Sequence, residues 1–401
     1  MRKELIYSIL KTTIMFLVLL NFGGVLSFFY PIPLGLAILS LSILFFILRR
    51  RFLIKKKYLY FLLIIYTILI VSIYVNKVSF VNYRGMFMSL FSSVLILSSF
   101  ESTKEVANYF IKACRIVMWL AFINFILTSL LPNLFVRAIA NDSSYEVFTI
   151  LYIFNDLGVS YQIAGVNFFR NQGIFWEPGV LQVIMNILIY YYLFEEKKSL
   201  KYILLPIFIL LTTASTTGLF LFAFLFTLKS IKEFDIKKFF IFVLVGISFV
   251  PILMNDIEYK FKGKGQQSSE LRTYDALMGL YIISKYPFTG IGIDNDKYEK
   301  ETGLSFVEVN GKNLTIERGN TNSIILLCLY FGIPLAIIIL YRVYHQRLFE
   351  KKWLFFIILI VCLMSEPLIT RMFFYLLLMS SIKIKSSKPE NNLSNNSLIA
   401  K

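Results

Sequence analysis

Long apolar segments alternate with short charged ones along almost the whole chain. The apolar runs lack the strict period-2 alternation of an outer-membrane strand. As helices, most are long enough to cross a hydrocarbon core of ~30 Å. The pattern therefore predicts an all-α, polytopic membrane protein of about twelve transmembrane helices. They are expected at 9–29, 31–48, 58–75, 85–100, 108–131, 176–194, 202–214, 216–229, 238–254, 321–342, 353–368 and 370–382.

One apolar stretch, 202–229, fits either one long helix or two short ones. The charged sequence "EEKKSLK" precedes it and "LKSIKEFDIKK" follows it, and both look cytoplasmic. Two crossings place both on the same side of the membrane, whereas one crossing does not. We therefore predict two helices that turn at 215–218.

Charge gives the predicted orientation. The chain has 41 Lys and Arg against 24 Asp and Glu, a net charge of +17. A soluble basic protein would suggest a nucleic-acid partner. Here, however, only 16% of all residues in the chain are charged. The twelve-helix topology places most of the basic excess, including "RRRFLIKKK" at 49–57, on one side. This is the positive-inside pattern, so we expect both termini in the cytoplasm and no nucleic acid.

Two long outer loops interrupt a single transmembrane domain, 1–385. They are expected at about 132–175 and 255–320, and both exceed a simple connector. Within the second, apolar residues at helical spacing in 271–287 predict an amphipathic helix on the membrane surface. The tail 386–401 is polar and of low complexity, which predicts a disordered cytoplasmic segment.

Cysteine and histidine do not indicate a metal site. The three cysteines fall within apolar segments, and their spacing suggests neither a disulfide framework nor metal ligation. The single histidine, His345, is expected on the cytoplasmic side. We therefore expect no metal and no cofactor.

The most unusual polar stretch is "FFRNQGIFWEPGV" at 168–180, where Arg170 and Glu177 flank the start of an apolar helix. Charge at a membrane entry costs free energy and is usually retained for function. An interfacial ion pair, with Trp176 in an aromatic belt, is the alternative. Pro178 and two glycines favour a shaped re-entry instead. Candidate site residues from this block are Arg170, Asn171, Gln172, Trp176 and Glu177.

A second arginine, Arg272, begins the amphipathic helix of the large outer loop. Alone it would be an ordinary surface residue. Together with Arg170 it could grip a diphosphate, because guanidinium groups bind phosphate oxygens in a bidentate manner.

Other polar groups near predicted outer helix ends are weaker candidates. Asn320 and Asn322 fit helix N-caps, which can also bind anions. Ser215 and Thr216 lie in "TTASTTG", where close packing is an equal explanation. Glu366 and Arg371 flank a short outer turn, and a local ion pair is the favoured reading there.

These segments resemble the bacterial O-antigen and capsule polysaccharide polymerase (Wzy) family, within the O-antigen ligase/polymerase superfamily. The resemblance rests on "FFRNQGIFWEPGV", "TTASTTG", "LRTYDALMGLYIISKYPFTGIGIDN" and "GNTNSIILLCLYFGIP", in that order, over about 160–340. It implies a glycosyltransferase that joins undecaprenyl-diphosphate-linked oligosaccharide repeat units on the outer face of the cytoplasmic (inner) membrane. Neither a metal nor a nucleotide sugar is implied.

The resemblance also implies roles and partners. It assigns Arg170 and Arg272 to the diphosphate, and leaves the base open; Glu177 is our first candidate and Glu366 our second. Asn171, Gln172, Trp176, Ser215, Thr216, Asn320, Asn322 and Arg371 would contact substrate. The implied partners are membrane lipids, a chain-length regulator and a flippase.

Two other functions stay open. A ligase would share the fold and the leaving group, but ligase-like members often have a His–Asn pair where this chain has Thr321 and Asn322. A flippase or transporter would show mid-helix charges and related halves. Most charges here lie at helix ends, and no repeat is detected.

Overall fold

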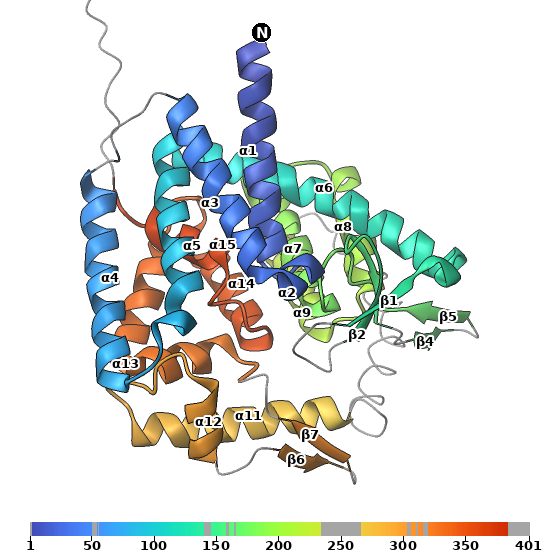
Figure 1. Cartoon of the computed structure of the whole chain (residues 1–401). Coiled ribbons are helices and arrows are strands. Elements are labelled where there is room, and N and C mark those ends of the chain that lie inside the picture. Colours follow the sequence, from blue (N-terminus) through green and yellow to red (C-terminus); the bar gives the residue numbers. More distant parts are fainter. Residues whose placement is uncertain are drawn as a thin grey trace, which may run out of the picture.

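The computed structural model describes residues 2–49, 54, 56–139, 146–157, 160–163, 166–233, 266–302, 306–309, 312–315 and 320–383 (Figure 1). This part of the chain is mostly helical. Seven of its helices are long and apolar enough to cross a membrane. The fold class is therefore that of a helical protein compatible with multiple membrane passes.

The amino-terminal helices follow the predicted apolar runs closely. The predicted helix 9–29 is interrupted at Gly23 and Gly24, where Gly23 has a φ of +132° that favours glycine. The helices are α1 (Arg2–Asn21), α2 (Val25–Phe29), α3 (Pro31–Leu48), α4 (Lys56–Asn76), α5 (Phe80–Ser99) and α6 (Thr103–Leu130).

Helix α7 lies at the centre of the bundle. Its residues from Val180 to Tyr190 are all buried, and it contacts α6, α8, α9 and α14. The predicted division of 202–229 into two helices is confirmed, but the turn lies at 213–215, earlier than the predicted 215–218, because helix ends at Thr212 and resumes at Thr216. The elements are α7 (Pro178–Tyr190), η2 (Tyr191–Glu195), η3 (Leu200–Tyr202), α8 (Leu204–Thr212) and α9 (Thr216–Glu233). The predicted helix 238–254 lies outside the described residues.

The carboxy-terminal helices are also at their predicted positions. They are α13 (Ser323–Tyr344), α14 (Lys352–Ser365) and α15 (Met372–Ser380). Helix α15 packs between α1, α5 and α13, so both ends of the sequence contribute to one core. The predicted tail 386–401 lies outside the described residues.

The predicted loop 132–175 contains short strands that the sequence analysis did not anticipate. After η1 (Pro132–Leu134), β1 (Val136–Ile139), β2 (Glu146–Ile150) and β3 (Phe154–Asp156) form an antiparallel sheet. A hairpin of β4 (Ser160–Ile163) and β5 (Val166–Phe169) follows. These hairpins lead the chain to the start of α7.

The second loop contains the predicted helix. Helix α11 (Gln266–Lys285) lies across one end of the bundle, roughly perpendicular to α4 (Figure 1). It buries Asp275, Gly279 and Ile282 and leaves Leu277 and Tyr281 exposed. Contact of that exposed apolar face with a membrane stays a prediction. After it come α12 (Asn295–Thr302), β6 (Phe306–Val309) and β7 (Lys312–Thr315).

The turn after α11 inserts into a break in α13. Gly332, with φ +77°, interrupts the helix, and the amide of Ile333 donates to the carbonyl of Pro287 at 2.8 Å. The amide of Ile291 donates to the carbonyl of Leu329 at 2.7 Å. A Cβ at Gly290 would lie 2.3 Å from that same carbonyl oxygen. The turn after α11 therefore docks on α13.

Candidate functional site

The segment that leads into α7 is held by the break between α1 and α2. Gly24 and Phe175 form an antiparallel bridge. The amide of Val25 donates to the carbonyl of Ile174 at 2.9 Å, and that of Trp176 to the carbonyl of Gly23 at 3.1 Å. The first two helices therefore fix the approach of the "RNQGIFWEPG" block to the bundle.

Glu177 is the residue that precedes α7, and its side chain does not cap the helix. Pro178 at the first helical position suits this start, because its fixed φ fits a helix and it has no N–H to satisfy. The half-buried carboxyl of Glu177 is hydrogen-bonded to the carboxyl of Glu366. The site thus joins the start of α7 to the end of α14.

Glu366 is 2% exposed and lies directly against the first turn of α7. A Cβ added at Gly179 would lie 1.8 Å from Glu366 Oε1. Ser323, the first residue of α13, holds the backbone beside it: its hydroxyl donates to the Glu366 carbonyl and accepts from the amide of Leu368 at 2.6 Å. The ends of α7, α13 and α14 therefore meet at this carboxyl.

Both predicted arginines lie close enough to Glu366 for their charges to act on its carboxyl. Burial raises the pKa of Glu366 well above its ordinary value, and the neighbouring Glu177 raises it further, whereas Arg272 and Arg170 act in the opposite direction. Glu366 therefore keeps its proton to a higher pH than an exposed carboxyl does. The site combines this carboxyl and that of Glu177 with two guanidinium groups.

Arg170 and Arg272 reach the site from different elements. Half-buried Arg170 donates from Nε to the carbonyl of Thr213 at 3.1 Å and from Nη2 to that of Ala214 at 3.3 Å. It thereby fixes the turn between α8 and α9. Arg272 lies on α11 and is exposed. Exposure thus falls from Arg272 through Glu177 to Glu366.

Asp275 and Asn320 hold α11 next to the start of α13. Asn320 is 1% exposed and donates from Nδ2 to the carbonyl of Asp275. The amide of Thr321 donates to Asp275 Oδ2 at 3.3 Å. Burial raises the pKa of Asp275, while the hydrogen bonds from Thr321 and the charge of Arg272 oppose that rise. These contacts hold α11, and with it Arg272, against the start of α13.

The predicted substrate residue Asn171 is part of the protein framework. Its Nδ2 donates to the carbonyl of Ala121 at 2.9 Å and to Thr212 Oγ1 at 3.0 Å, and its Oδ1 accepts from Asn124 and from the amide of Gly173. Gln172 differs: it is fully buried, and neither amide atom has a partner in the described part of the chain. Of these two amides, only Gln172 keeps donor and acceptor capacity for a water or a ligand.

Two further candidates act as helix caps, and a third begins a helix. The side chain of Asn322 accepts from the amides of Ile324 at 2.9 Å and Ile325 at 3.2 Å, so it caps α13. Ser215 accepts from the amide of Gly218 at 3.3 Å, just before α9. Thr216 is the first residue of α9 and is partly buried. The helix N-cap predicted for Asn322 is confirmed.

Trp176 and Arg371 form a separate contact beside the carboxyl pair. Trp176 is 6% exposed, so it does not occupy the exposed position that an aromatic belt would need. The Arg371 guanidinium lies over its ring at 4.6 Å. The electrostatic neighbours of Glu366 are Glu177, Arg272 and Arg170. Arg371 therefore packs on Trp176. The predicted ion pair between Arg371 and Glu366 is not formed among the described residues.

Glu366, predicted only as the second candidate base, is central to the site, and Asp275 was not predicted. The close backbone approach predicted for Gly179 is confirmed by its contact with Glu366. An acid within a strongly apolar carboxy-terminal segment was the available signal for Glu366. No local pattern marks Asp275, because its partners lie on another helix. In the described ranges, no group of three or more His, Cys, Asp or Glu side chains is placed to hold a metal ion.

Comparison with known proteins returned no match. No protein-family model, curated protein or solved structure is significantly similar to this chain. The functional argument therefore rests on the geometry of the site and on the sequence pattern.

Proposed function

We propose that this chain is a polysaccharide polymerase, which joins undecaprenyl-diphosphate-linked oligosaccharide repeat units for O-antigen or capsule synthesis. One observation carries the proposal. Arg170 and Arg272, which are far apart in the sequence, both lie near the hydrogen-bonded carboxyls of Glu177 and Glu366. Two guanidinium groups beside a proton-holding acid pair suit the transfer of a group away from a diphosphate.

The proposed topology places this site at the outer face of a bacterial cytoplasmic membrane. About twelve crossings with both termini in the cytoplasm put the start of α7, the start of α13 and the α14–α15 turn on the outer side. The positive-inside distribution of charge supports that orientation. The lipid-linked substrates would then reach the site laterally, with α11 above it.

The proposed reaction needs a base and a stabilised leaving group. The acceptor hydroxyl oxygen attacks the anomeric carbon of the donor sugar, the bond from that carbon to the phosphate oxygen breaks, and the hydroxyl proton passes to Glu177. The leaving diphosphate keeps the bonding electron pair, and Arg170 and Arg272 stabilise its charge. Glu366, whose pKa is raised by burial, donates its proton in the hydrogen bond to Glu177 and so orients it.

A reconstituted assay tests the proposal. The purified chain, in proteoliposomes with undecaprenyl-diphosphate-linked repeat units and no nucleotide sugar, should convert single units into a ladder of longer glycans. The carrier diphosphate should be released in proportion. Absence of elongation by a folded protein, with its native repeat unit supplied, would contradict the proposal.

A further inference from the structure

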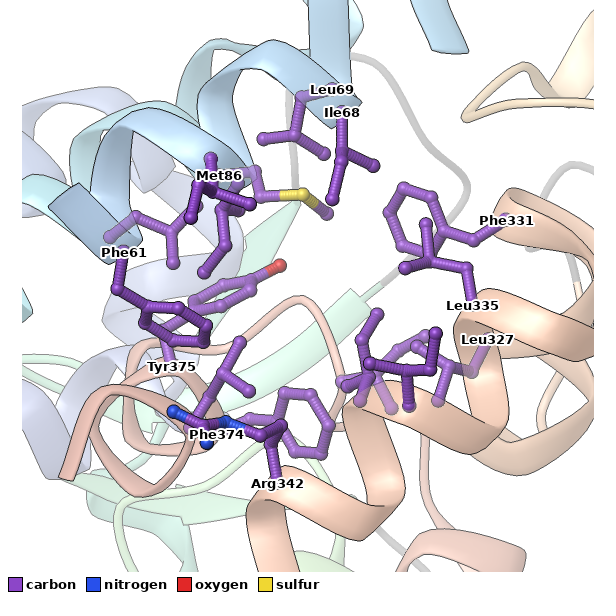
Figure 2. A pocket seen from close by; sticks show the side chains of 17 residues that line it. Phe61, Ile68, Leu69, Met86, Leu327, Phe331, Leu335, Arg342, Phe374 and Tyr375 are labelled. Carbon is purple, nitrogen blue, oxygen red and sulfur yellow. The ribbon is translucent and has the colours of Figure 1, made fainter. Parts of the chain in front are cut away.

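A cavity of about 320 Å³ lies between α4, α5, α13 and α15, and none of its lining residues belongs to the candidate site (Figure 2). Its walls are almost entirely apolar, with Phe61 and Leu69 from α4, Met86 from α5, and Leu327 and Leu335 from α13. Its volume is at the lower end of the range for ligand pockets. It can therefore hold a hydrocarbon chain but not a whole lipid.

The cavity opens towards the lipid-facing side of the bundle. Two of its lining residues, Ile64 on α4 and Ile338 on α13, are each 56% exposed. Both helices are long and apolar enough to cross a membrane. An apolar hollow with such an opening would be filled by a lipid chain in a bilayer, because an empty one forfeits dispersion contacts on every wall.

Two polar groups distinguish this cavity from an ordinary lipid-facing surface. The Tyr375 side chain is 4% exposed, and its hydroxyl has no partner in the described part of the chain. Figure 2 shows that hydroxyl within the cavity. Arg342 lies at one end, with its guanidinium over the Phe61 ring at 4.6 Å and its buried Nε also without a partner among the described residues. Buried donors of this kind normally have an acceptor.

We infer that this cavity binds one anionic glycerophospholipid, with an acyl chain between α4 and α13 and its phosphate on Arg342. The Tyr375 hydroxyl then donates to an ester oxygen of the same lipid. Guanidinium groups bind phosphate oxygens well. The site does not depend on the proposed polymerase activity.

The position of Arg342 favours a phospholipid over the lipid-diphosphate substrate. It lies in the last turn of α13, whereas Asn320 and the candidate site lie at the other end. The helical segment between the break at Gly332 and Arg342 alone spans roughly 15 Å. A lipid with its diphosphate at Arg170 and Arg272 would bring only an uncharged tail to Arg342. The positive-inside pattern assigns the Arg342 end to the cytoplasmic leaflet, where anionic lipids attract basic groups.

Native mass spectrometry of the full chain, released from nanodiscs of mixed phosphatidylglycerol and phosphatidylcholine, tests the inference. The wild-type chain should retain one phosphatidylglycerol after excess lipid is removed. Arg342→Gln should reduce that occupancy about tenfold, whereas Arg347→Gln, on an exposed arginine at the same end of α13 and outside the cavity lining, should not. Leu335→Trp, which fills the cavity, should reduce occupancy as well.

Several outcomes would overturn the inference. The first is equal retention of phosphatidylglycerol by Arg342→Gln and wild type, and the second is preferential retention of phosphatidylcholine. The third is a polyisoprenyl lipid bound at this site in protein purified from its native membrane. If Leu335→Trp does not fold, the thermal shift that phosphatidylglycerol gives wild type over Arg342→Gln decides the question, and equal shifts would contradict the inference.

Discussion

The carboxyl of Glu177, at the start of α7, is hydrogen-bonded to that of Glu366, at the end of α14. Because Glu366 is 2% exposed and Gly179 leaves room for it, the contact is built into the packing of the two helices. Burial raises the pKa of Glu366, so this carboxyl keeps its proton to a higher pH than an exposed one. This gives the two glutamates different roles and makes them separable by mutation.

Replacement of each glutamate by glutamine should have unequal effects. Glu177→Gln removes the proposed base and should lower elongation roughly 10²–10⁴-fold. Glu366→Gln should be milder, because a carboxamide can donate a hydrogen bond as a protonated carboxyl does. Initial rates on lipid-linked repeat units measure both. Wild-type activity of Glu177→Gln would remove this residue as the base.

Gly179→Ala should disturb the pair without changing any charge. The new methyl group would meet Glu366 Oε1 at 1.8 Å, so the carboxyl or the helix must move. Such overpacking costs about 1–3 kcal/mol, and elongation should fall with it. Gly85→Ala is the matched control, since nothing lies within 4 Å of a Cβ there. Equal activity and melting temperature of the two variants would contradict the described packing.

Stability should depend on pH through Glu366. Its pKa is raised in the folded chain, so above its ordinary value of 4.5 the folded state holds a proton that the unfolded state has released. Stability should therefore be highest below about this pH and fall as pH rises towards the folded pKa. Thermal unfolding in detergent across this range measures the slope.

Two variants identify the source of that slope. Glu366→Gln should reduce it, because glutamine does not titrate. Asp275→Asn should reduce the slope of stability against pH independently, since burial raises the pKa of Asp275 as well. An unchanged slope in Glu366→Gln would show that this carboxyl ionises normally.

The two arginines should differ in their effects on protein stability. Arg170→Ala and Arg272→Ala should each abolish polymer, because both guanidinium groups are proposed to hold the leaving diphosphate. Only Arg170→Ala should also lower the melting temperature, since Arg170 hydrogen-bonds the turn between α8 and α9. Arg84→Ala, on an exposed arginine of α5, is the control. Polymer of normal length from Arg272→Ala would refute the diphosphate clamp.

The helices were predictable because apolar length is a local property of the sequence. Predicted and observed bounds agree within a few residues for α3, α4 and α15. The break at Gly23 was missed although the glycine pair at 23–24 is a local signal for a helix break. The strands of 132–175 were missed because short hairpins in a polar loop carry little periodic signal.

The candidate site was predictable only in part. Arg170 and Glu177 stood out because charge within an apolar sequence is costly. The contact of Glu177 with Glu366 joins distant segments and has no local signature. Asn171 matched the pattern of a ligand-binding residue, yet its amide is used by Ala121, Thr212 and Asn124. Composition identifies unusual residues, whereas their partners depend on packing.

Deletion of the gene in its own host, with lipid-linked and surface glycans resolved by size, tests the central claim most directly. A polymerase predicts that single repeat units replace the ladder of long chains, and that Arg272→Ala fails to restore it where Arg84→Ala succeeds. Full-length chains stranded on the lipid carrier would instead indicate a ligase. Loss of outward-facing lipid-linked units would indicate a transporter, and either result would contradict the proposed function.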